Sequence, residues 1–179
     1  MEPITLLTEE EVDELLGLDE YEEYEFEEMI IKYIKSKKIH NKLGNLILKK
    51  FLKPNKLSKQ RIWASDISRL IYLIFRAIGK QKNWVRDKKG ELFTELITTP
   101  IISRIENLMR DYMKHLLSKF NKHNIDNNNE NAIYLDYAQT AEHMLSKFYT
   151  DKVKRELLKF IASKLPISVK QNELLEEVC

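Results

Sequence analysis

The stretch 62–120 constrains the fold most, because it has the pattern of two amphipathic helices joined by a short basic segment. Apolar residues in its first part recur at helical spacing behind an N-cap at Ser65 or Asp66, and Gly79 ends the pattern. The apolar residues of this stripe are Ile67, Leu70, Ile71, Ile74 and Ile78. A stripe of this width predicts a helix that is buried between other elements.

A β-hairpin and a long helix are expected next. Residues 83–97 are rich in aromatic and branched side chains around a turn at 87–90, which predicts a short hairpin. Thr99 followed by Pro100 is a good helix start, because proline at the first helical position loses no hydrogen bond. The helical period then continues to Phe120.

The remaining chain is also predicted to be helical. Further amphipathic patterns cover residues 8–16, 21–38, 43–52, 134–148, 151–165 and 171–178, and the Asn-rich residues 121–131 predict a loop. Four glycines and four prolines are few for a β-barrel or sandwich. We therefore predict a mainly α protein, an orthogonal or irregular bundle of about six to seven helices with one short β-hairpin near residues 83–97.

The charges are strongly segregated along the chain. Residues 2–28 hold 13 acidic side chains and no basic one, whereas residues 32–61 hold 11 basic side chains and no acidic one. Beyond the acidic leader, 30 basic side chains face 15 acidic ones. Such a body can bind polyanions, although both charge runs could equally be solvated helix faces. We expect a helical N-terminal segment at 1–53, a linker at 54–62 and a helical domain with the hairpin at 63–179.

No pattern in the sequence predicts catalysis. The four glycines are isolated, so no phosphate-binding loop is present, and we expect no cofactor. The histidines lie at positions 40, 115, 123 and 143, without a pair at metal-ligand spacing, so we expect no metal site. Cys179, the single cysteine, is the last residue, and no nucleophile motif is present, so we expect this thiol to be incidental. We therefore expect a protein that is not an enzyme.

The cellular compartment and the absence of membrane contact are predicted from features that the sequence lacks. One cysteine suits a reducing compartment, and the acidic N-terminus is unlike a signal peptide. The longest apolar run, 70–75, is far shorter than the ~20 residues that span a bilayer. We expect a soluble intracellular protein without membrane contact, in the host cytoplasm or nucleus if it is viral.

Basic residues gather around one tryptophan in the segment 80–89. Clustered Lys and Arg neutralise phosphates, and single strands also favour an aromatic ring on which bases stack. The candidate nucleic-acid-binding residues are Lys80, Lys82, Trp84, Arg86, Lys88, Lys89 and, on the long helix, Arg104. Two interpretations of Trp84 stay open, because a tryptophan beside a hairpin can also be a core residue.

Four pieces of the chain carry a family resemblance. They are the apolar stretch Asp66–Phe75, the segment Lys82–Val85 with its hairpin, the stretch Ile101–Phe120, and the tail Lys154–Ile167. Their order, from residue 63 onward, resembles the helical D5-type N-terminal domain that precedes the helicase in primase-helicases of large DNA viruses, phages and plasmids. Residues 1–53 lie outside the resemblance, and the helicase itself has no counterpart in this chain.

This resemblance implies a non-catalytic module of viral or mobile-element DNA replication. Such a module would bind DNA or support a primase-helicase, so DNA, a helicase and further copies of the chain are the candidate partners. The alternative is a structural adaptor, whose apolar helix faces recruit another protein and whose lysines serve solubility.

Overall fold

The structure is a computed structural model, and it describes residues 1–123, 135–139, 141–143 and 148–167. The N-terminal part is helical. It consists of α1 (Glu9–Leu16), the 3₁₀ turn η1 (Leu18–Glu20), α2 (Glu25–Lys35), α3 (Ile39–Phe51) and the 3₁₀ turn η2 (Leu57–Lys59). The predicted helix at 8–16 is confirmed as α1, and a capping box begins it, because Thr8 and Glu11 each accept a hydrogen bond from the other's backbone N–H.

A three-stranded antiparallel sheet follows, where the sequence pattern predicted a buried helix. Its strands are β1 (Ile62–Asp66), β2 (Ile71–Ile78) and β3 (Gln81–Asp87), in the spatial order β1-β2-β3. The prediction of a mainly α bundle with one hairpin near 83–97 is therefore wrong. The fold is mixed, with helices dominant and a sheet of three strands.

Local turn chemistry explains why residues 66–79 do not form a helix. Asp66, expected as an N-cap, instead accepts hydrogen bonds from the hydroxyl of Ser68 and the backbone N–H of Arg69, which closes the turn between β1 and β2. Gly79, expected as a helix stop, has φ +61° in the tight turn between β2 and β3. A two-residue hairpin turn with glycine first requires such a positive φ.

The second half of the chain returns to helices. It contains the 3₁₀ turn η3 (Lys88–Gly90), α4 (Glu91–Phe93), the π-helical turn η4 (Thr94–Thr98), α5 (Thr99–His123) and α7 (Asp151–Lys164). The predicted second strand of the hairpin is thus helical, and β3 pairs with β2 instead. The long helix over 101–120 is confirmed, as is the helix from Asp151. The expected helix start at Thr99 is wrong, because the backbone is already helical from Glu91 through α4 and η4 into α5.

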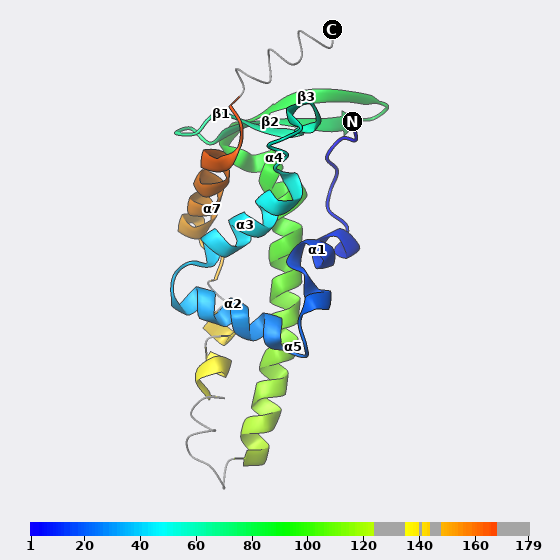
Figure 1. Cartoon of the computed structure of the whole chain (residues 1–179). Coiled ribbons are helices and arrows are strands. Elements are labelled where there is room, and N and C mark those ends of the chain that lie inside the picture. The colour runs from blue at the N-terminus through cyan, green and yellow to red at the C-terminus, as the bar shows by residue number, and fades with distance from the viewer. Residues whose placement is uncertain (124–134, 140, 144–147, 168–179) are drawn as a thin grey trace.

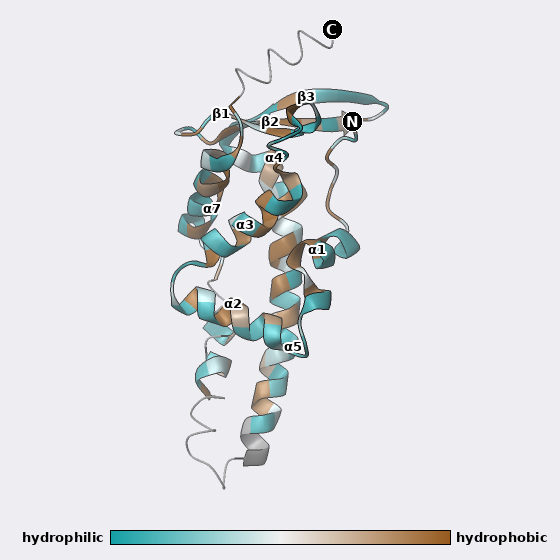
Figure 2. Cartoon of the chain, in the orientation of Figure 1, coloured by the Kyte–Doolittle hydropathy of each residue, from teal (hydrophilic) through white to brown (hydrophobic). Residues whose placement is uncertain are grey.

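The sheet lies across one end of the helical body, and α5 runs away from it along the length of the molecule (Figure 1). α7 packs beside α3 so closely that a Cβ atom on Gly44 would lie 2.3 Å from Cδ1 of Phe160. Apolar side chains of the helices and of β1 and β2 form one hydrophobic core, from Ile4 to Leu165 (Figure 2). This core includes residues on both sides of 54–62. The expected division of the chain into two segments joined by a linker at 54–62 stays a prediction.

The described ends of the chain both pair with the sheet. Ile4 forms a parallel bridge with Arg76 of β2, and Ile167 forms one with Ala64 of β1. Most of the predicted loop at 121–131, the helix at 171–178 and part of the helix at 134–148 lie outside the described residues.

Candidate nucleic-acid interface

The two faces of the β2–β3 hairpin differ sharply in their side chains. The register pairs Ile74 with Val85 and Phe75 with Trp84, so residues alternate between the face toward the helices and the face away from them. The inner face carries Tyr72 and Ile74, both 0% exposed. The outer face carries Lys82, Trp84 and Arg86 of β3, opposite Ala77, Phe75 and Leu73 of β2. Three predicted site residues therefore share one open face.

Trp84 belongs to this outer face and not to the hydrophobic core. Its indole packs against the Phe75 ring with the centroids 5.3 Å apart and the planes 52° apart. Both side chains are half-buried, and neither packs against the core cluster of the described residues. Trp63, by contrast, is 1% exposed at the β1 end of the sheet, where its Nε1 donates to the backbone oxygen of Gln60. Of the two tryptophans, only Trp84 presents part of its ring to solvent.

Five exposed cations accompany these rings. Lys80 lies in the hairpin turn, Lys82 and Arg86 lie on β3, and Lys88 and Lys89 lie in η3. Within the described part of the chain, none of the five forms an ion pair with a carboxylate. Their positive charge is thus available to an anionic ligand.

The carboxylate nearest in sequence points the other way. Asp87, the last residue of β3, is 3% exposed on the inner face and accepts hydrogen bonds from the backbone N–H groups of Leu92 and Phe93, both at 2.8 Å. Burial raises the pKa of Asp87, although these two hydrogen bonds act in the opposite direction. Asp87 therefore fixes the start of α4 against β3 and does not cancel the charge of the outer face.

Arg104 is not part of this interface. It lies on α5, where its Nε donates to Oδ1 of Asp13 at 2.7 Å and its Nη1 is 3.5 Å from Oε1 of Glu9. The hydrogen bond to Asp13 raises the pKa of Arg104. The ion pairs of Arg104 link the acidic helix α1 to α5. The helical spacing of residues 99–120 alone could not predict these partners.

Further interface residues were missed by the sequence analysis. Phe75 was assigned to a helix, so its place beside Trp84 could not be foreseen. Lys154 and Arg155 of α7 line a shallow pocket with Lys89 and Leu70, so they extend the basic surface from η3 to α7. Asp151, the first residue of α7, also lines this pocket. The only sequence signal for this extension is the three basic residues Lys152, Lys154 and Arg155.

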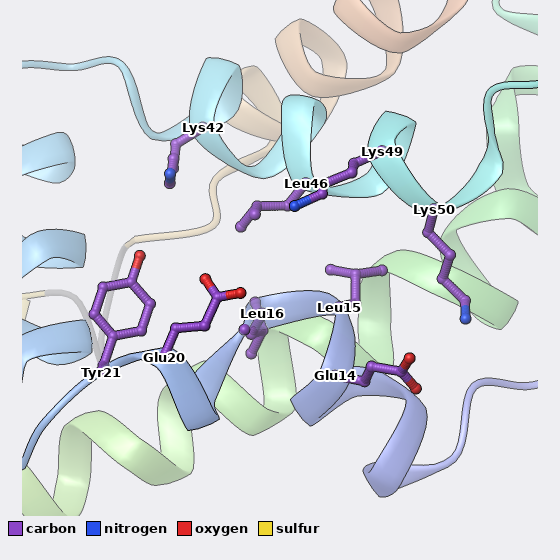
Figure 3. A pocket seen from close by; sticks show the side chains of 10 residues that line it. Glu14, Leu15, Leu16, Glu20, Tyr21, Lys42, Leu46, Lys49 and Lys50 are labelled. Carbon is purple, nitrogen blue, oxygen red and sulfur yellow. The ribbon is translucent and has the colours of Figure 1, made fainter. Parts of the chain in front are cut away.

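A second pocket, between α1 and α3, has a different character (Figure 3). Its wall from α1 and η1 carries Glu14 and Glu20, and its wall from α3 carries Lys42, Lys49 and Lys50. Lys50 also lies 3.9 Å from Glu11, measured from Nζ to Oε2. Because both signs of charge line it, this pocket does not select for a polyanion, and it lies apart from the hairpin.

The described residues also bear on metal sites, buried carboxylates and membrane-spanning helices. No group of three His, Cys, Asp or Glu side chains in the described ranges is arranged to hold a metal ion. Burial raises the pKa of Glu27, which is 7% exposed on α2. No helix in the described part of the chain has the length and apolar character needed to cross a membrane.

Comparison with models of known protein families, with curated proteins and with solved structures finds no match. The resemblance to the D5-type domain therefore stays a prediction. Of its four pieces, 101–120 and 154–164 lie in helices, whereas 66–75 contains the end of β1, a turn and the start of β2.

Proposed function

We propose that this chain is a non-catalytic module that binds nucleic acid through the outer face of its β2–β3 hairpin and the adjoining turn η3. One observation carries the proposal: exposed Lys82 and Arg86 lie on the same face of β3 as the half-buried Trp84, and exposed Lys80, Lys88 and Lys89 lie in the turns at the two ends of that strand. None of the five has a carboxylate partner in the described residues. Clustered unpaired cations attract phosphates and release their counterions, which is the main source of affinity in such complexes.

The proposed biological setting is DNA replication of a virus or mobile element, in support of a primase-helicase. This setting is supported only by the resemblance of residues 63–179 to the D5-type domain, in particular by the helical pieces that precede and follow residues 124–134. It is a separate proposal from nucleic-acid binding, and a pull-down with the cognate helicase would test it.

Binding itself is tested by fluorescence anisotropy with labelled oligonucleotides over a range of salt concentrations. If four or five phosphates are contacted, log Kobs should fall with log salt at a slope of about −3 to −4.5. The variant K82A/R86A/K88A/K89A should lose most of the affinity and most of this slope, because it removes four of the five phosphate contacts.

A matched control removes the same charge elsewhere. Lys32 and Lys38 are exposed on or beside α2, and Arg110 and Lys114 are exposed on α5. α2 and the later turns of α5 lie away from the sheet (Figure 1). The variant K32A/K38A/R110A/K114A should keep the wild-type slope and most of the affinity. Equal losses in both quadruple variants would show a nonspecific charge effect and would refute an interface at the hairpin.

The alternative function, a protein-binding adaptor, is favoured by one apolar surface. A groove between the end of α3 and the end of α7 is lined mainly by apolar side chains, and Ile167 at its edge is 55% exposed. The other apolar lining residues are Leu52, Pro54, Leu57, Leu165 and Pro166. Size-exclusion chromatography with light scattering discriminates the two functions, because an adaptor would form an oligomer or complex that nucleic acid does not affect.

A further inference from the structure

The aromatic pair on the hairpin indicates which form of nucleic acid fits the interface. Phe75 and Trp84 face each other across β2 and β3, outside the hydrophobic core, with exposed Lys82 and Arg86 on either side of Trp84 on the same strand. A cross-strand aromatic pair contributes to the stability of the sheet, and on a face outside the core it also leaves part of the Trp84 ring accessible to a ligand.

We infer that the outer face of the hairpin binds single-stranded nucleic acid, with a base stacked on Trp84 and phosphates bound by Lys82 and Arg86. This inference rests on the proposed function and specifies its ligand. Bases in a duplex already stack on each other and are covered by the two backbones, whereas an unpaired base can lie flat on an exposed ring.

The spacing along β3 suits this arrangement. Lys82, Trp84 and Arg86 alternate with inward-facing residues, so the two cations lie roughly 13 Å apart along the strand with the indole midway. Flexible cations on both sides of one ring can hold the phosphates that flank a stacked base. Phe75, which supports the indole from β2, keeps the Trp84 ring on the open face.

The basic surface continues beyond the strand. Lys88 and Lys89 follow directly after β3, and Lys89 shares a pocket with Lys154 and Arg155 of α7. A strand that leaves Arg86 can therefore pass over η3 to the first turns of α7. This path predicts contact with several nucleotides, within the range of roughly 4 to 16 that single-strand-binding modules cover.

The test uses the full chain and three labelled probes of about 15 nucleotides. The probes are oligo(dT), oligo(rU) and a DNA duplex. We expect at least a tenfold tighter Kd for a single strand than for the duplex, near physiological salt. Tighter binding of oligo(dT) or of oligo(rU) would identify DNA or RNA as the preferred strand, and either result supports the inference.

Intrinsic fluorescence reports stacking directly, because the chain has only two tryptophans and Trp63 is buried. A single strand should quench the emission of Trp84, and W84F should lose this quenching while it keeps most of the affinity. W84A should weaken single-strand binding roughly five- to a hundredfold, the loss expected for one stacked base. The duplex affinity of W84A should change little.

The two proposals fail in different ways. If neither single strands nor the duplex bind, the proposed function is wrong. If K82A/R86A/K88A/K89A weakens binding, but the duplex binds as well as single strands and no quenching occurs, only the single-strand inference is wrong. Circular dichroism checks the fold of W84A, and W84F with the quenching assay provides the test if W84A does not fold.

Discussion

The inner and outer faces of the β2–β3 hairpin come from the same two strands, yet they have different roles. Side chains of the inner face, such as Tyr72 and Ile74, lie in the hydrophobic core, and Asp87 is hydrogen-bonded to α4. Side chains of the outer face, such as Lys82, Trp84 and Arg86, lie outside the core. The two cations among them, Lys82 and Arg86, lack ion-pair partners among the described residues. Residues one position apart should therefore affect different properties: stability on the inner face and binding on the outer face.

The largest expected effect comes from neighbouring apolar residues on opposite faces. Ile74 is 0% exposed, so I74A should lower the free energy of unfolding by about 3 to 4 kcal/mol, because it removes buried methylene groups and leaves a cavity. Leu73 is half-buried on the outer face, so L73A should cost about 1 kcal/mol. Urea denaturation measures both. Equal losses would mean that the outer face contributes to folding as much as the inner face does.

Asp87 should give the next largest effect on stability. D87A leaves the buried N–H groups of Leu92 and Phe93 without their acceptor and should cost about 2 to 3 kcal/mol. D87N retains one acceptor oxygen and should cost less. Thermal unfolding of both variants, with E10Q as a control on an exposed carboxylate, measures the difference. A loss for D87A no larger than that for E10Q would contradict the anchoring role.

The raised pKa of Asp87 also predicts a dependence on pH. Because the folded pKa lies above the unfolded value of 3.8, the folded state binds the proton more tightly, so protonation stabilises it. The stability of the wild type relative to D87N should therefore increase as pH falls from neutral toward the unfolded pKa of Asp87 and stay level below it. A relative stability that decreases over this range would show that the two hydrogen bonds outweigh burial.

The sequence predicted the helices well, because their signals are local. The patterns at 8–16 and 43–52 depend on neighbouring residues, and they coincide with α1 and with all but the first turn of α3. The pattern at 101–120 coincides with α5, but its expected start at Thr99–Pro100 lies inside a helical backbone that begins at Glu91. Helical period and caps favour such segments, but they do not suffice alone, because residues 66–79 carry the same signals and form a turn and a strand.

The sheet could not be predicted with the same certainty. A run such as 70–75, apolar at every position, fits a buried strand as well as a buried helix. The pairing of β2 with β1 and β3 makes this run a strand, and such pairing depends on residues that are not its sequence neighbours.

For the site, the spacing of Lys82, Trp84 and Arg86 was visible in the sequence, but their common face depended on β3 being a strand. The place of Arg104, away from the hairpin, could not be foreseen because its partners, Glu9 and Asp13, lie in a helix far away in the sequence.

Arg104 and Arg86 provide the finest comparison, since both are arginines and only Arg104 has a carboxylate partner in the described residues. The pair of Arg104 with Asp13 is partly exposed, so R104A should cost at most about 1 kcal/mol of stability. It should leave nucleic-acid affinity unchanged. R86A should do the reverse, with unchanged stability and a salt slope that is smaller by about 0.7. A double-mutant cycle of R104A and D13A isolates the pair, and anisotropy measures binding. Weaker binding by R104A at unchanged stability would return Arg104 to the interface and show that positive charge on α5 also contacts phosphates.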